Sequence, residues 1–94
     1  MSATISGQKT ITTAGTELQL HAGLAVNCAV MIKALPANTG VMYVGQVAGV
    51  LSSSTGMPLS AGEVLIMDQV GNLNEIWVDS TVNGEGVAWL LLEV

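Results

Sequence analysis

Hydrophobic and polar residues alternate along several short stretches of the chain, which is the spacing of β-strands. The clearest stretch is Ala25–Ala34 (AVNCAVMIKA), in which every second residue from Val26 onward is small or apolar. Because side chains on a strand point alternately to opposite faces, this pattern predicts a strand with one face in the core. Its other face is mixed and carries Asn27, Met31 and Lys33.

Six further stretches have strand-like patterns rich in Val, Ile and Thr, which suit a pleated surface. These predicted strands are Gln8–Thr13, Glu17–Leu20, Val41–Gln46, Glu63–Asp68, Glu75–Thr81 and Val87–Val94. Eleven glycines divide the chain into pieces of strand length and disfavour helices.

The segments between these strands contain turn residues. Ala14–Thr16 is predicted to close a first hairpin, and Asn83–Gly86 (NGEG) a second, because Asn-Gly tolerates the positive φ of tight turns. Leu35–Gly40 is predicted to be a turn and Gln46–Gly62 an irregular loop with apolar ends.

The last predicted strand is unusual because both of its faces are apolar. Val87, Trp89 and Leu91 fall on one side, and Ala88, Leu90 and Leu92 on the other. Such a strand needs two apolar neighbours, which can be two layers of its own fold or one layer and a second subunit.

These patterns predict an all-β protein, a compact antiparallel β-sandwich or jelly-roll-like barrel of about seven to eight strands. The 94 residues are enough for a single domain, 1–94, and we expect residues 1–6 to form a flexible N-terminal arm.

Composition adds a reason to expect self-association. Half of the residues are hydrophobic and only 10% are charged, against about 25% charged in typical globular domains. A small domain has much surface for its volume, so surplus apolar residues are expected on the outside, where apolar patches mark interfaces. We therefore expect an obligate homo-oligomer, a trimer or a dimer.

The charges exclude one class of partner. The formal net charge is −5, and Lys9 and Lys33 are the only lysines or arginines. Tight nucleic-acid binding is excluded because neutralising phosphates requires many cations.

Neither a membrane span nor a signal peptide is indicated. Mean hydropathy is +0.59, but Gly, Asn, Ser or Pro interrupts every window long enough to cross a bilayer. The first six residues lack the basic and apolar regions of a signal peptide. The single cysteine, Cys28, is predicted to be a core thiol in a reducing compartment.

The residues of known catalytic and metal sites are scarce. His21 is the only histidine, and it is predicted to be a solvated surface residue and not a general base. With one Cys and one His, no zinc site, other metal site or cofactor site is expected. Gly84–Gly86 is interpreted as turn chemistry only. We therefore expect a protein that is not an enzyme.

One pattern leaves a binding function open. Glu75 and Asp79 are predicted to share the face of one strand with Trp77 between them. A tryptophan flanked by acids can form a platform for a sugar, so a receptor- or carbohydrate-binding module is the alternative function. The simpler interpretation is a solvated face on which Trp77 is partly covered by a neighbouring strand or subunit.

Several segments, which together cover nearly the whole chain from Gly7, resemble one group of proteins. They are Gly7–Thr16 with Leu18–Leu20, Ile32–Gly40 with Met42–Gly45, Leu59–Glu63, Asn72–Asp79 and Gly84–Leu90. In these segments the chain resembles small virion proteins encoded among the head genes of tailed bacteriophages. The shared features are turns and strands, not active-site signatures.

The resemblance implies a structural virion protein, and within that group it favours a capsid decoration or cement protein. Such a protein binds the major capsid protein on the outer surface of the head after synthesis in the host cytoplasm. A head-fibre or tail component is the alternative within the same resemblance. The net charge of −5 favours the outer surface, away from packaged DNA.

Seven apolar residues are predicted to contribute to subunit or capsid interfaces. They are Val50, Leu51, Met57, Leu59, Trp77, Trp89 and Leu91. Four of these residues lie in the segment Val50–Leu59, which is the expected capsid contact because its apolar ends have no evident core role. The alternative is that this segment is an ordinary flexible surface loop.

Overall fold

The computed structural model describes residues 6–45 and 56–92. In these residues it contains eight strands and one short 3-10 helix. They are β1 (Ser6–Ile11), β2 (Leu18–Gln19), β3 (Ala25–Ala34), β4 (Met42–Gly45), β5 (Met57–Leu59), β6 (Val64–Asn72), η1 (Leu73–Glu75), β7 (Trp77–Ser80) and β8 (Glu85–Leu91).

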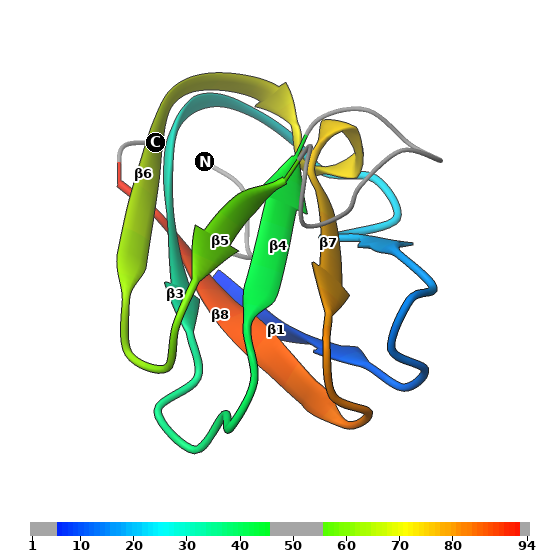
Figure 1. The fold of residues 1–94 in the computed structure, drawn as a ribbon. Helices are drawn as coiled ribbons and strands as arrows, with labels where there is room; N and C mark the ends of the chain where they lie inside the picture. Colours follow the sequence, from blue (N-terminus) through cyan, green and yellow to red (C-terminus); the bar gives the residue numbers. More distant parts are fainter. Residues whose placement is uncertain (1–5, 46–55, 93–94) are drawn as a thin grey trace.

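The strands form two four-stranded sheets packed against each other. Sheet A has the order β1-β8-β3-β6 and sheet B the order β2-β7-β4-β5, and all neighbours are antiparallel. In Figure 1 strands β5, β4 and β7 lie in front of β3, β8 and β1. The predicted all-β sandwich is therefore confirmed.

The core lies between the two sheets and is built from alternate residues, as the sequence pattern predicts. In β3 the side chains of Cys28, Val30, Ile32 and Ala34 are buried. Ile32 lies between Leu65 of β6 and Trp89 of β8 in the strand register. The other buried apolar residues come from every remaining element except β2, and from two positions that lie beside β2 and β7, Leu20 and Ile76. Those within elements are Ile11, Met42, Val44, Leu59, Val70, Leu73, Val78, Val87, Trp89 and Leu91.

The predicted first hairpin is wrong. Gln8–Thr13 overlaps β1, which pairs with β8, whereas Glu17–Leu20 overlaps β2, which pairs with β7 in the other sheet. The connection between them has the expected turn residue, since Gly15 has a φ of +90°. The chain turns there but crosses from sheet A to sheet B.

The predicted second hairpin is wrong for the same reason. Gly84 has a φ of +83°, as an Asn-Gly turn requires, but β7 belongs to sheet B and β8 to sheet A. Glu85 and Gly86, which the sequence assigns to the turn, are the first residues of β8.

Three element boundaries also differ from the predictions. The predicted loop Gln46–Gly62 contains β5, which pairs with β4, and Pro58 is accommodated because β5 is an edge strand. Strand β6 extends to Asn72, which caps η1 by accepting a hydrogen bond from Asn74 N. Ser6, expected in the N-terminal arm, belongs to β1 and is the register partner of Leu90.

The backbone of β1 lies so close to position 86 that only glycine fits there. A Cβ at this position would overlap the carbonyl oxygen of Lys9 on β1. The backbone of Gly86 is also paired on its other side, because Asn38 Nδ2 donates to Gly86 O at 2.9 Å and Gly86 N donates to Asn38 Oδ1 at 3.3 Å. Asn38 is itself buried, so it links the Leu35–Gly40 turn to β8.

Glu85 also holds the Leu35–Gly40 turn, through hydrogen bonds on its solvent-exposed side. Its carboxylate accepts hydrogen bonds from Thr39 N at 2.6 Å, Thr39 Oγ1 at 2.8 Å and Gly40 N at 2.9 Å. The backbone bonds from Thr39 and then Gly40, with the Thr39 hydroxyl, hold the pKa of Glu85 below its ordinary value.

We expect the hydrogen bonds between the Glu85 carboxylate and the Leu35–Gly40 turn to make the stability of the fold depend on pH. A carboxyl whose pKa is lower in the folded state stabilises the fold above its unfolded pKa, and this contribution is lost as the pH falls through the folded pKa. The urea midpoint of the unmodified protein should therefore fall when the pH is lowered below the ordinary glutamate pKa. Glu85→Gln should have a lower urea midpoint at neutral pH, and its midpoint should fall less on acidification. Glu75→Gln, which removes the same charge from η1, is the control and should leave the fall in place. Equal pH profiles for Glu85→Gln and the unmodified chain would contradict this assignment.

Candidate functional site

The outer face of sheet A, the face turned away from the core, is largely apolar. It is formed by alternate residues of β8, β3 and β6 and by Leu92, which follows β8 and whose N–H donates to Ala29 O of β3. Four of its side chains are among the most exposed large hydrophobic residues in the described part of the chain: Val64 (47%), Ile66 (51%), Leu90 (40%) and Leu92 (42%). We call this surface the outer face.

The strand register aligns these side chains in rows across the sheet. Leu90, Met31 and Ile66 are register partners and form one row. Ala88, Lys33 and Val64 form the next row. Side chains opposite each other on one face lie about 4.5–5.5 Å apart at Cβ, so each row is a continuous strip. Lys33 is the only charged residue in these two rows.

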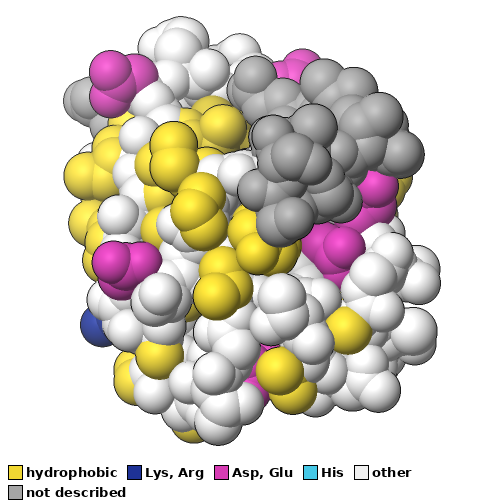
Figure 2. All heavy atoms as spheres, in the orientation of Figure 1, with side chains coloured by type: hydrophobic (Ala, Val, Ile, Leu, Met, Phe, Trp, Pro, Cys, Tyr) yellow, Lys and Arg dark blue, Asp and Glu magenta, His cyan; other side chains and the backbone are white. Residues whose placement is uncertain are grey.

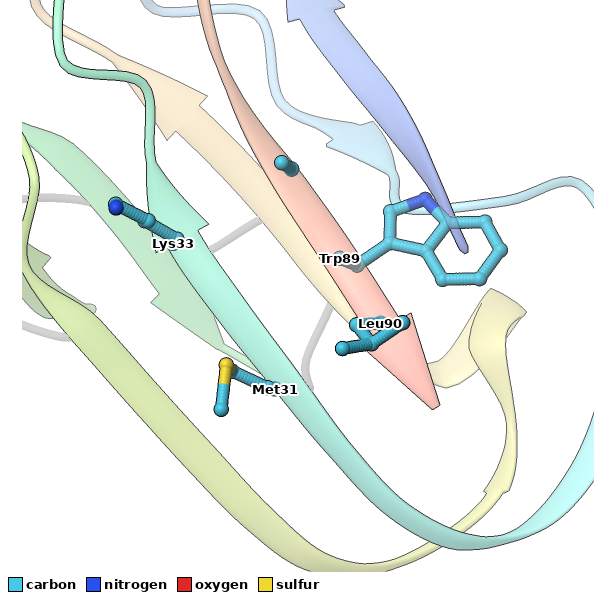
Figure 3. Close-up of a pocket in the computed structure, with 5 residues that line it drawn as sticks. Met31, Lys33, Trp89 and Leu90 are labelled. Atoms are coloured by element: carbon cyan, nitrogen blue, oxygen red, sulfur yellow. The ribbon is translucent and has the colours of Figure 1, made fainter. Parts of the chain in front are cut away.

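A shallow hollow of about 160 Å³ lies on the outer face. Met31, Lys33, Ala88, Trp89 and Leu90 line it. Figure 3 shows Met31 and Lys33 extending from β3 and Leu90 from β8, while the Trp89 ring points away from them. Such a hollow can receive an apolar side chain of another protein, but it holds no pair of groups for acid-base chemistry.

A second apolar region lies between β6 and β5, the edge strands of the two sheets. Leu65 and Met67 are only partly buried against the core, and Met57 is 52% exposed. Figure 2 shows hydrophobic side chains gathered over β5 and β6.

The structure places the predicted interface residues in three settings. Val50 and Leu51 lie outside the described residues, as does most of the predicted contact segment Val50–Leu59. Met57 is exposed and Trp77 is half-buried, so both have area left for a partner.

The other three predicted interface residues are core residues, which corrects that prediction. Leu59, Trp89 and Leu91 are 5%, 4% and 7% exposed. The alternation in β8 is as predicted, but the second sheet covers the Trp89 side. The exposed side carries Leu90 and Leu92 instead.

Trp89 is buried because its neighbours leave room for the indole. The backbone of Gly7, its register partner on β1, lies against the ring, where a Cβ would be 2.7 Å from Cζ2. His21 packs edge-on against the same ring, with centroids 6.1 Å apart and an interplanar angle of 87°. His21 is thus half-buried and not fully solvated, and its Nδ1 accepts a hydrogen bond from Gly23 N.

The predicted arrangement of acids around Trp77 is not present. Glu75 is exposed, but it belongs to η1 and not to the strand. Asp79 is 6% exposed, and its Oδ1 accepts hydrogen bonds from Gly15 N at 3.0 Å and Ser80 N at 2.7 Å. Asp79 therefore fastens the connection between β1 and β2, and it does not border an open platform.

The chemistry-bearing residues remain scattered in the fold. Within residues 6–45 and 56–92, no three His, Cys, Asp or Glu side chains form a group that could hold a metal ion. Cys28 is buried, as predicted for a core thiol. In the same residues no helix is long and apolar enough to span a membrane.

Comparisons with known proteins give no relative from which a function could be transferred. No protein-family model, curated protein or solved structure matches the chain.

Proposed function

We propose that this chain is a structural virion protein that binds and stabilises the head shell of a tailed bacteriophage as a homo-oligomer and performs no chemistry. The observation that carries the proposal is the outer face, on which surplus apolar residues of a weakly charged chain lie in two rows whose only charged side chain is Lys33. The resemblance of its segments to phage head-gene products supplies the partner, the major capsid protein.

The physical mechanism is binding linkage. A protein that binds only the expanded shell stabilises that state by RT ln(1 + [L]/Kd) per site, or about 2.7 kcal/mol at a free concentration of one hundred times Kd. Many copies on one shell add their contributions. An apolar contact surface suits this role because burial of apolar area is the main favourable term in association.

The outer face is the surface that we assign to the shell. Its rows lie on a rigid sheet whose opposite side is the core, so binding needs little reordering of the chain. The platform around Trp77 has no comparable support, because Asp79 is committed to backbone hydrogen bonds.

The test is co-sedimentation of the purified protein with head shells of the phage whose genome encodes it. We expect saturable binding to expanded shells and little binding to unexpanded precursors. Leu90→Asp, which introduces a charge into the outer face, should abolish binding while the fold is retained. Thr12→Asp, an exposed position in the connection between β1 and β2, is the charge-matched control and should bind normally. Absence of binding by the unmodified protein, or equal loss in both variants, would refute the proposal.

A further inference from the structure

The four edge strands of the sandwich differ in how well they are protected from pairing with another chain. An unprotected edge offers unpaired backbone N–H and C=O groups to any neighbouring strand. In the described structure β2 has only two residues, and β5 has three and contains Pro58. Strand β1 is mostly polar and carries Lys9. Short length, proline and lysine are all known means of blocking an edge.

The fourth edge, β6, has none of these protections along its first half. It is nine residues long, and its segment Val64–Met67 is apolar on both faces. Among the described strands it pairs only with β3. Val64 and Ile66 are about half exposed there.

The hydrogen-bond pattern shows which backbone groups of β6 face the open edge. Ala34 N donates to Glu63 O at 3.0 Å, so Glu63 faces β3. Facing and non-facing residues alternate in an antiparallel ladder. The N–H and C=O groups of Val64 and Ile66 therefore point away from β3, toward the open edge.

We propose that β6 pairs antiparallel with β6 of a second copy of this chain, about a two-fold axis at Ile66. The outward backbone groups of the two Ile66 residues would then exchange hydrogen bonds, and the two A sheets would form one eight-stranded sheet. This inference deepens the self-association in the proposed function and specifies its interface.

Side-chain complementarity supports this register. The row Leu90, Met31 and Ile66 continues directly into the same row of the second copy, so the two outer faces become one apolar surface. In this register Val64 lies opposite the partner's Asp68. Lys33 is the register partner of Val64 on β3, so its backbone lies two strand spacings, or about 10 Å, from the backbone of that aspartate. A lysine side chain can cross most of this distance. No acid lies directly opposite another acid.

This arrangement also explains how self-association and shell binding can coexist. A face-to-face dimer would bury the outer face in the subunit contact. Pairing along β6 leaves that face open and doubles its extent. The geometry therefore favours the edge over the face as the contact between copies.

The first experiment uses Ile66→Pro, which removes the backbone N–H group that faces the open edge and also replaces the isoleucine side chain. Sedimentation equilibrium of the unmodified protein from micromolar to millimolar concentration should give twice the 9.6 kDa chain mass. Ile66→Pro should give the monomer mass, with a near-UV spectrum showing that the fold is retained. Ile66→Ala keeps the N–H and is the matched control; it should still dimerise, although more weakly.

The second experiment needs no change in the backbone, so it tests the proposal even where Ile66→Pro fails to fold. In a Cys28→Ala background, Ile66→Cys should form an intermolecular disulfide, since paired residues across the axis are about 5.5 Å apart at Cα. Leu90→Cys should not, because five strand spacings of about 4.8 Å separate the two copies.

Three results would overturn the β6 contact. They are a monomer or a trimer for the unmodified protein, a dimer that survives Ile66→Pro, and cross-linking through Leu90→Cys in place of Ile66→Cys. None of these measurements involves a shell, so loss of the β6 contact and failure to bind shells are separate outcomes.

Discussion

Gly86→Ala is expected to destabilise the protein so strongly that little folded protein remains at room temperature. The added methyl group would overlap the carbonyl oxygen of Lys9, and Lys9 C and Thr10 Cα would each lie 3.0 Å away. Overpacking against movable side chains costs about 1–3 kcal/mol, but here the obstacle is the backbone of β1. Relief of the overlap requires separating β1 from β8, and a small domain has only about 5–15 kcal/mol of total stability.

Gly23→Ala is the matched control for this substitution. No atom lies within 4 Å of a Cβ at Gly23, and its φ is not positive. Urea unfolding followed by tryptophan fluorescence should show a lost or greatly reduced folded baseline for Gly86→Ala and a nearly unchanged midpoint for Gly23→Ala. A Gly86→Ala midpoint equal to that of Gly23→Ala would show that β1 and β8 are not as closely apposed as described.

Trp89→Ala is expected to lower the free energy of unfolding by about 3–5 kcal/mol, the usual cost of removing a large aromatic side chain from a core. The substitution removes the ring that packs against Gly7 and His21. Leu90→Ala, at the next position but on the exposed side of β8, should cost less than about 1 kcal/mol, as is usual for surface substitutions. Chemical denaturation of both variants measures the difference.

The Trp89→Ala result also distinguishes a loss of stability within one chain from a loss of association between chains. Trp89→Ala should change the unfolding free energy at every protein concentration, because the ring belongs to the core of one chain. If it instead left the folded monomer stable and only dissociated the oligomer, the core position of Trp89 would be wrong.

The strands could be predicted from the sequence because alternation is a local property. Ala25–Ala34 is a strand with its predicted bounds and its predicted buried side. Strand pairing could not be predicted, because Gly15 and Gly84 signal a reversal of the chain without indicating the sheet in which the next strand lies. Both wrong hairpins arise from this ambiguity.

The candidate surface could be predicted only in part. The sequence divides the last strand correctly into the Trp89 side and the Leu90 side, but both sides are apolar and the larger side chains suggest an interface. The deciding factor is Gly7, whose missing side chain leaves space for the indole inside the sandwich. That contact joins residues 82 positions apart, and no local pattern contains it.

The pairing of β1 with β8 has a consequence for how the protein is made. Ser6 is aligned with Leu90, so β1 cannot pair with its neighbour until β8 has been synthesised. Strand β8 also lies between β1 and β3, and sheet A cannot close until residues 85–91 have been translated. Folds dominated by such distant pairings reach the native state in milliseconds to seconds, and not in microseconds. During synthesis the apolar strand β3 therefore remains without one of its neighbours, and a chaperone that holds it in this interval should raise the yield of folded protein.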